Sequence, residues 1–332
     1  MSDDTAPVRS KMQAHGLALA LFLLAPFIGE WLFGNQPITA LGSLVLLAPM
    51  YGGGALLIRE MARRCGLGWP TMILLAAAYA LAEEGPIDQM LWNPLYGGID
   101  FAAAYADTHV PWLGTSGQLV FDALSVHAIW SISVPIALVE AFDPAPRRPW
   151  LGLIGLAAVA AIFIAGSAFL AMAQIEADPF VATPWQYATA AIAIIGLVAA
   201  AFAQSRYHEA ALGAAPRPWL VGLAVFALTS LYFGRDLMSD ALSGWNSVAL
   251  GCGLAVFGFV LLARWSGRAG WTRGHAVAAA GGAVLTYAWV GFDHGRSLDV
   301  PPQTTVLGST IFALASLALL AAAIRSVQGR RG

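Results

Sequence analysis

Two adjacent acidic residues and one histidine are the side chains whose types and positions could do chemistry. Glu83 and Glu84 lie near the end of one long apolar segment, and His127 lies within the next. An ionisable side chain inside a membrane span costs about 2.5–3.5 kcal/mol on insertion scales, so it marks a functional site by default. A desolvated carboxylate can serve as a general base, and a histidine can orient water or stabilise an oxyanion. We therefore expect Glu83, Glu84 and His127 to form a catalytic site.

Helical rise places these three side chains at a shared depth. The carboxylates lie about 20 Å along a helix that begins near Pro70, and His127 lies about 13 Å along an antiparallel helix that begins near Gln118. Both positions fall in the outer half of a bilayer about 30 Å thick.

The residues after the acidic pair predict a break in the helix. Pro86 has no N–H to donate, and its ring disfavours helical geometry at Gly85. Broken backbone at membrane depth is tolerated only inside protein or beside a watery cavity. We expect a polar chamber open to the outer face, with the segment 92–117 as its cap.

Other polar residues near the outer face complete the candidate site. Asp122, Arg235 and Asn246 are candidates for binding substrate. If a divalent metal is held, the candidate ligands are Glu84, His127 and Asp122, since imidazole and carboxylate suit zinc or manganese. No motif requires a cofactor.

Each of these residues also has a structural interpretation. The glutamates could pair with Arg235 and join helices, and His127 or Ser131 could be hydrogen-bonded packing groups. Asp122 is close enough to the interface to be solvated. So are two further residues at this face, Asp293 and His294.

Features elsewhere in the spans have structural interpretations only. The glycines at 52–54 are expected to let helices approach closely. Arg59, Glu60 and Glu140 are expected to snorkel or pair at the cytoplasmic helix ends, and Trp150 is expected to anchor the interface.

The composition requires these residues to be positioned by membrane helices. Of the 332 residues, 58% are hydrophobic and 11% are charged, whereas soluble domains carry about 25% charged residues. This excludes a soluble enzyme, a nucleic-acid binder and a disordered protein. The two cysteines do not form a disulfide framework.

The predicted fold is an all-α, polytopic membrane helix bundle. A short tail (1–15) precedes a transmembrane domain (16–325), and a second tail (326–332) follows it. Ten apolar runs are long enough to span a bilayer: 16–34, 38–58, 70–91, 118–139, 150–173, 184–204, 218–234, 246–264, 274–292 and 304–325.

The basic residues support this count. Of the 17 Lys and Arg, all but Arg235 and Arg296 fall on one side of the predicted topology, which the positive-inside rule assigns to the cytoplasm. Both termini are therefore expected in the cytoplasm, and the chain is expected in a cell membrane of the bacterial inner-membrane type.

The acidic pair followed by a histidine resembles the CAAX-protease and bacteriocin-processing family of glutamic intramembrane proteases. That family shows Glu-Glu-x-x-x-Arg, then Phe-x-x-x-His, then a second His. Glu83, Glu84 and His127 match the pair and the first histidine, whereas Asp88 stands in the arginine slot and Ala123 in the phenylalanine slot. The resemblance implies a multi-helix protein that activates water for peptide cleavage.

Three functions remain open from the sequence. The first is a membrane-embedded hydrolase or protease acting on a membrane peptide or small molecule. The second is a transporter or channel for a proton, cation or small polar solute, favoured by the broken helix and the acidic outer face. The third is a non-catalytic scaffold or sensor. Membrane lipids are the expected surroundings, and the oligomeric state is left open.

Overall fold

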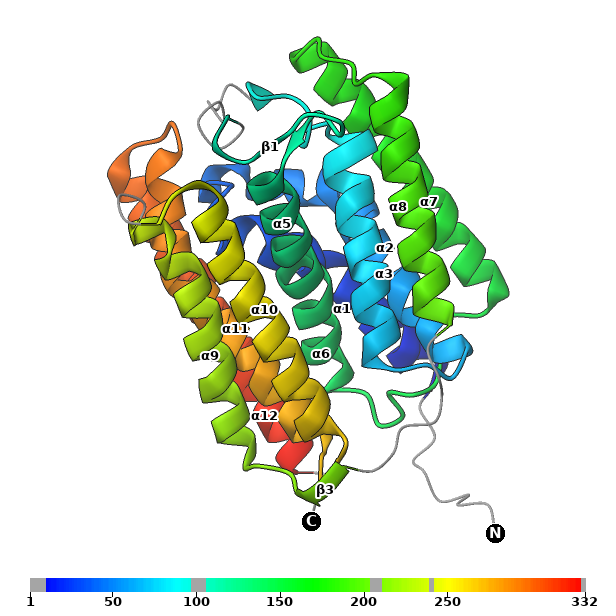
Figure 1. The fold of residues 1–332 in the computed structure, drawn as a ribbon. Coiled ribbons are helices and arrows are strands. Elements are labelled where there is room, and N and C mark those ends of the chain that lie inside the picture. Colours follow the sequence, from blue (N-terminus) through cyan, green and yellow to red (C-terminus); the bar gives the residue numbers. More distant parts are fainter. Residues whose placement is uncertain (1–9, 97–105, 204–210, 239–241, 330–332) are drawn as a thin grey trace.

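The computed structural model describes residues 10–96, 106–203, 211–238 and 242–329, and these fold into a bundle of long, roughly aligned helices (Figure 1). The helices are α1 (Lys11–Pro26), α2 (Leu44–Arg64), α3 (Trp69–Ala82), α5 (Gly117–Val126), α6 (Val134–Glu140), α7 (Leu153–Ala177), α8 (Pro184–Phe202), α9 (Pro218–Gly234), α10 (Gly244–Ser266), α11 (Arg273–His294) and α12 (Pro302–Gln328). The all-α prediction is confirmed.

Short elements connect the helices. Strand β1 (His109–Val110) pairs antiparallel with β2 (Thr115–Ser116), and β3 (Ala211–Ala214) pairs parallel with β4 (Arg268–Ala269). The 3-10 turns whose residues the structure describes in full are η2 (Ile38–Ser43), η6 (Asp236–Met238) and η7 (Gly295–Ser297).

In the part of the chain that the structure describes, π-helical turns occur in three helical spans. η1 (Phe27–Leu32) continues α1, η3 (Glu83–Ile87) continues α3, and η5 (His127–Ser133) joins α5 to α6. The break expected near Pro86 is confirmed in this form. The helix widens into η3, and Gln89 then adopts a left-handed φ of 63°.

Eight helical stretches in the described residues are long and apolar enough to cross a membrane: 11–32, 38–64, 117–140, 153–177, 184–202, 244–266, 273–297 and 302–328. The two other expected segments are also helical. α9 is a shorter apolar helix, and α3 with η3 contains the acidic pair. A total of ten crossings, with cytoplasmic termini, stays a prediction.

The helix that carries His127 lies at the centre of the bundle. Trp130 of η5 is fully buried in a core formed with α9, α11 and α12, where its ring stacks on Tyr287 at 4.5 Å. Ile132, two residues later, is fully buried in a second core formed with α1, α2 and α3. Packing on both sides fixes the position of η5 in the bundle.

Three consecutive glycines let α2 contact three neighbours. A Cβ at Gly52 would overlap the Phe22 carbonyl of α1, and a Cβ at Gly54 would lie 2.5 Å from the Tyr79 ring of α3. At Gly53 the neighbour is Phe163 of α7, 3.1 Å away. The predicted close approach of helices is confirmed.

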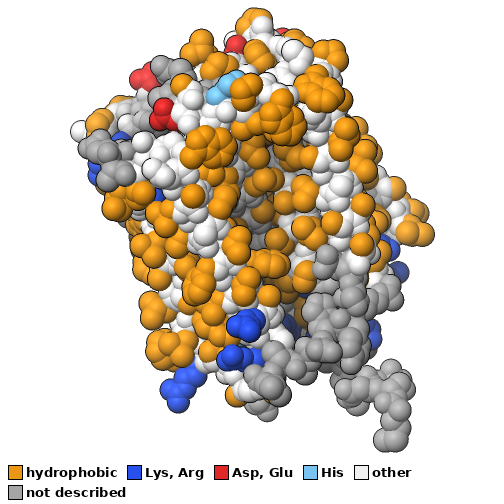
Figure 2. Space-filling model, in the orientation of Figure 1, with side chains coloured by type: hydrophobic (Ala, Val, Ile, Leu, Met, Phe, Trp, Pro, Cys, Tyr) orange, Lys and Arg blue, Asp and Glu red, His pale blue; other side chains and the backbone are white. Residues whose placement is uncertain are grey.

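The surface is that of a protein whose sides face an apolar medium. On the face drawn in Figure 2, hydrophobic side chains cover the sides of the bundle, and Lys and Arg gather mainly toward the lower end.

Candidate functional site: a buried carboxylate–histidine cluster

The candidate site lies where the three π-helical turns meet. η1 carries Glu30, η3 carries Glu83 and Glu84, and η5 begins with His127. A π turn adds a residue to a helix and rotates the side chains that follow, and such turns occur frequently at functional sites. Glu30, Glu83, Glu84 and His127 are thus held on irregular backbone.

The structure brings Glu83, Glu84 and His127 together. Nε2 of His127 lies 2.6 Å from Oε1 of Glu84, and Nδ1 lies 3.0 Å from Oε2 of Glu83. Nδ1 is also 3.1 Å from the Ser131 hydroxyl, one turn further along η5. Each nitrogen of the imidazole therefore faces a carboxylate within ion-pair distance, while its hydrogen bonds are to Glu84 at Nε2 and to Ser131 at Nδ1.

The cluster is almost enclosed by protein. Glu83 is fully buried, and Glu84 and His127 are each 8% exposed. In the described part of the chain, Oε2 of Glu84 is buried and has no hydrogen-bond partner. The chamber expected to open outward is thus a closed site. Both oxygens of Glu83 also lack a hydrogen-bond partner among the described residues, so three carboxylate oxygens of the cluster are left for further donors.

A tyrosine beside the histidine connects the cluster to a third carboxylate, Glu30. The Tyr51 hydroxyl of α2 donates to Oε1 of Glu30 at 2.6 Å, and its ring centroid lies 6.0 Å from that of His127. Gly29 allows this contact, because a Cβ there would lie 2.9 Å from the Ser131 hydroxyl and 3.1 Å from the Tyr51 ring.

Tyr51 is the residue of this site that sequence reasoning missed. Glu30 is recognisable from the sequence as an acidic residue in an apolar span. Its partner is not, because a tyrosine in a membrane helix has many structural uses.

The segment after η3 covers the cluster on the side where α3 and η3 end. Leu91 and Trp92 are buried against Leu119 and Ala123 of α5 and against α8, and the Trp92 ring would lie 3.3 Å from a Cβ at Gly85. The start of the segment 92–117 therefore lies over the carboxylate–histidine cluster. Residues 97–105 lie outside the described residues.

A second acid–tyrosine pair lies in this cover. The Tyr96 hydroxyl donates to Oδ2 of Asp88 at 3.3 Å. Burial and the nearby Asp88 carboxylate raise the pKa of Tyr96, so its hydroxyl stays protonated and acts as the donor.

Two of the three residues predicted to bind substrate, Asp122 and Arg235, form a different cluster with Tyr232. Arg235 pairs with Asp122, which also accepts from the Tyr232 hydroxyl at 2.7 Å. The guanidinium lies 4.3 Å from the centre of the Tyr232 ring. Asn246 is exposed at the start of α10.

This arrangement separates Asp122 from the proposed metal ligands. Within the described residues no three His, Cys, Asp or Glu side chains are arranged to hold a metal ion. The predicted trio of Glu84, His127 and Asp122 is not assembled, because Asp122 is engaged by Arg235 and Tyr232.

Asp293 and His294 lie outside the cluster. Asp293 is about half exposed and 3.7 Å from Arg296, which agrees with the solvated interpretation. The His294 ring lies 4.2 Å from that of Phe33.

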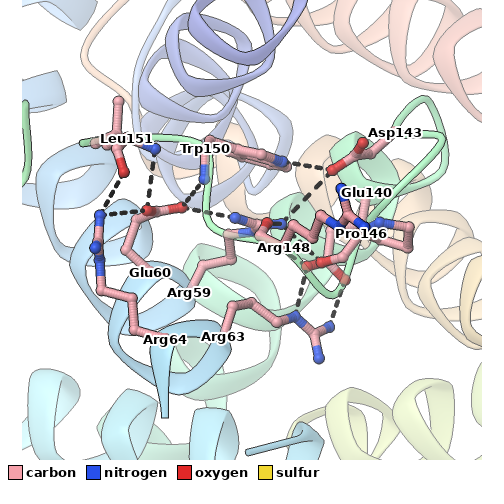
Figure 3. Close-up of polar contacts among 10 residues, drawn as sticks. All are labelled: Arg59, Glu60, Arg63, Arg64, Glu140, Asp143, Pro146, Arg148, Trp150 and Leu151. Carbon is pink, nitrogen blue, oxygen red and sulfur yellow. Dashed lines mark hydrogen bonds and ion pairs between the residues drawn. The ribbon is translucent and has the colours of Figure 1, made fainter. Parts of the chain in front are cut away.

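The end of the bundle at which α2 and α6 terminate holds a buried ion network (Figure 3). Arg59 lies 2.6 Å from Glu60 and 3.1 Å from Glu140, and Arg63 lies 2.6 Å from Glu140. The predicted pairing of these residues is confirmed. The predicted snorkelling of Arg59 is wrong, because its side chain is fully buried among carboxylates and backbone carbonyls.

Trp150 belongs to this network and does not anchor the interface. It is 4% exposed, its Nε1 donates to Asp143 at 2.6 Å, and the Arg59 guanidinium lies 3.6 Å above its ring. The anchoring prediction is wrong for Trp150 because the loop 141–150 folds inward, and a loop's path cannot be read from a local sequence.

Comparisons with protein-family models, with curated proteins and with solved structures found no match. The class of this chain therefore follows from its fold and its site alone. It is a helical bundle of the multi-pass membrane type with a buried Glu–His–Glu cluster.

Proposed function

We propose that this protein is a membrane-embedded hydrolase that cleaves a peptide bond in or near the membrane. The observation that carries the proposal is the placement of a carboxylate at each ring nitrogen of His127, 3.0 and 2.6 Å away. The resemblance of Glu83, Glu84 and His127 to the residues of glutamic intramembrane proteases supports the same chemistry.

The difference in burial between the two glutamates separates their roles. Glu84 is 8% exposed and Glu83 is fully buried, so Glu84 is the carboxylate nearer to entering water. Oε2 of Glu84, which lacks a protein donor among the described residues, would hold that water. Glu83 is a positioning residue, because it faces Nδ1 and fixes the orientation of the ring.

The proposed reaction is a hydrolysis in which every atom is accounted for. Glu84 takes a proton from the water, and the water oxygen forms a bond to the carbonyl carbon of the substrate. The C–N bond then breaks, and the leaving nitrogen receives a proton from the His127–Glu84 pair. The products are a carboxylic acid and an amine. Opening of the cover at Leu91 and Trp92 would admit the substrate.

Ser131 provides a variant of this mechanism within the same class. Its hydroxyl lies 3.1 Å from Nδ1 of His127, whose other nitrogen faces Glu84. These are the partners of a Ser–His–Glu triad. The two schemes differ in one result, because Ser131→Ala retains most activity if water is the nucleophile and loses it if Ser131 is.

The test is peptide cleavage by the purified full chain in proteoliposomes. A library of synthetic transmembrane peptides is incubated in ¹⁸O-labelled water, and new carboxyl termini carrying ¹⁸O are detected by mass spectrometry. We expect cleavage by the wild type and its loss in Glu84→Gln and His127→Ala. Asp293→Asn, which neutralises an exposed carboxylate, is the matched control and should cleave normally. Unchanged cleavage in both site variants would remove the site.

Proton-coupled transport is a second candidate, favoured by two hydroxyl–carboxylate pairs beside the cluster. Tyr51 donates a hydrogen bond to Glu30, and Tyr96 donates one to Asp88. Such pairs can pass protons. Its test is the collapse of a pH gradient across proteoliposomes loaded with a pH-sensitive dye. Collapse that persists after combined substitution of Glu83, Glu84 and His127 by neutral residues would contradict a proton path through this cluster.

A further inference from the structure

We propose that a cavity at the arginine-rich end of the bundle binds the phosphate-bearing headgroup of an anionic phospholipid. The cavity has a volume of about 420 Å³ and lies between the start of α3, the end of α6 and the start of α11. This size is within the range of ligand sites in proteins. The proposal is independent of the hydrolase.

The charge of the lining favours an anion. Three arginines (Arg63, Arg147 and Arg273) and one acid (Glu140) line the cavity, which gives a net charge of +3 − 1 = +2. Glu140 is already engaged by Arg63, at 2.9 and 2.6 Å. The positive charge that remains therefore belongs to Arg147 and Arg273.

The arginines are held in different ways. Nη1 of Arg273 donates to the Asp143 carbonyl at 2.5 Å, which fixes its guanidinium beside the cavity. Arg147 is exposed at the mouth. A planar guanidinium makes paired hydrogen bonds to phosphate oxygens, so this arrangement suits a phosphate group.

The remainder of the lining fits a lipid better than a free ion. Trp69 and Trp271 border the cavity, and Ala137, Ala141 and Val277 form apolar wall. Tryptophan is enriched at the membrane interface, where its ring meets both headgroup and hydrocarbon. Basic pockets between helices on the cytoplasmic side are typical sites for anionic headgroups, and the positive-inside rule assigns this end to that side.

The test uses the detergent-purified full chain and native mass spectrometry. The protein is mixed with equal amounts of phosphatidylglycerol and phosphatidylcholine of the same acyl chains, and the lipid retained is counted. We expect preferential retention of phosphatidylglycerol. Arg147→Gln should lower that retention about fivefold, the factor expected for one basic residue at an anionic membrane surface.

Arg148→Gln is the matched control. Arg148 is the exposed neighbour of Arg147 but does not line the cavity, so its substitution should leave lipid retention unchanged. Ala276→Phe, which fills the cavity without changing charge, should also reduce retention. Equal losses in Arg147→Gln and Arg148→Gln would show diffuse surface attraction and overturn the proposal, as would equal retention of the two lipids by the wild type.

A second arm separates the lipid from free phosphate. Millimolar inorganic phosphate is added to the lipid-loaded protein, with chloride at equal ionic strength as the control. We expect phosphatidylglycerol to stay bound, because the apolar wall also contacts the lipid. Complete displacement by phosphate but not by chloride would assign the cavity to a free phosphate and overturn the lipid proposal.

Discussion

At the scale of single residues, two buried clusters bring groups of opposite charge together. His127 has a carboxylate at each nitrogen, and Arg59 lies between Glu60 and Glu140. Leaving one partner of a buried pair uncompensated costs about 3–5 kcal/mol, whereas the complete pair contributes little net stability. Removal of one charged partner from either cluster is therefore expected to lower the free energy of unfolding, and substitutions can measure that loss.

Removing the histidine should destabilise the protein. His127→Ala leaves Glu83 and Glu84 buried without their common partner, so we expect the free energy of unfolding in detergent to fall by about 3 kcal/mol or more. The control is His15→Ala on the exposed face of α1, which should have no effect. Adding Glu83→Gln and Glu84→Gln to His127→Ala should restore part of the loss. If His127→Ala is as stable as the wild type, the pairing of His127 with the two glutamates is absent.

We expect loss of the Tyr51 hydroxyl to lower the free energy of unfolding, and loss of the Tyr287 hydroxyl not to lower it. Tyr51→Phe deprives Glu30 of its 2.6 Å donor and should lower the free energy of unfolding by about 1–3 kcal/mol. Tyr287 is also buried, but its hydroxyl has no hydrogen-bond partner within the described residues. Tyr287→Phe should therefore be neutral or slightly stabilising. Equal effects in thermal unfolding would contradict the assigned Glu30–Tyr51 bond.

At the scale of elements, three π-helical turns converge on one polar cluster. Each turn departs from the regular helix where a span carries an ionisable residue. The regular parts of the spans follow from hydropathy and length, and the break near Pro86 follows from the missing N–H. The π turns of η1 and η5 do not follow from local sequence, because tertiary packing selects them.

The need for tertiary packing also explains which side-chain contacts the sequence did not predict and which it predicted wrongly. Partners such as Tyr51 for Glu30, and Trp150 for Arg59, lie far apart in sequence and meet only after the helices pack. Asp122 was predicted as a metal ligand together with Glu84 and His127, should a metal be held. Helix rotation instead places it against Arg235 and Tyr232.

Crowding at Gly29 gives a test of the convergence of η1 on the site. Gly29→Ala would place a methyl group 2.9 Å from the Ser131 hydroxyl and 3.1 Å from the Tyr51 ring, an overpacking that should destabilise the protein by about 1–3 kcal/mol. Gly16→Ala in the same span meets nothing within 4 Å and should be tolerated. If thermal unfolding ranks the two variants equally, η1 does not pack against the site as described.

At the scale of the whole molecule, the two clusters lie at different levels of the bundle. The arginine network lies where α2 and α6 end, and the Glu–His–Glu cluster lies beyond the far end of α3. The positive-inside rule then assigns the network to the cytoplasmic side and the cluster to the outer half of the membrane.

Cysteine accessibility tests this orientation. In a background with Cys65→Ser and Cys252→Ser, single cysteines are introduced by Ser10→Cys, Gln328→Cys and Ser297→Cys. A membrane-impermeant maleimide added to intact cells should label only Ser297→Cys, and the other two should react after permeabilisation. Labelling of Ser10→Cys or Gln328→Cys in intact cells would overturn the topology.

The most direct test of the central claim is the rate of ¹⁸O incorporation into cleaved peptides by Glu84→Gln relative to the wild type and Asp293→Asn. General acid–base catalysis contributes about 10²–10⁴-fold to a rate. We therefore predict that Glu84→Gln is at least about a hundredfold slower than the wild type, while Asp293→Asn matches it. Incorporation by Glu84→Gln at the wild-type rate would contradict the hydrolase.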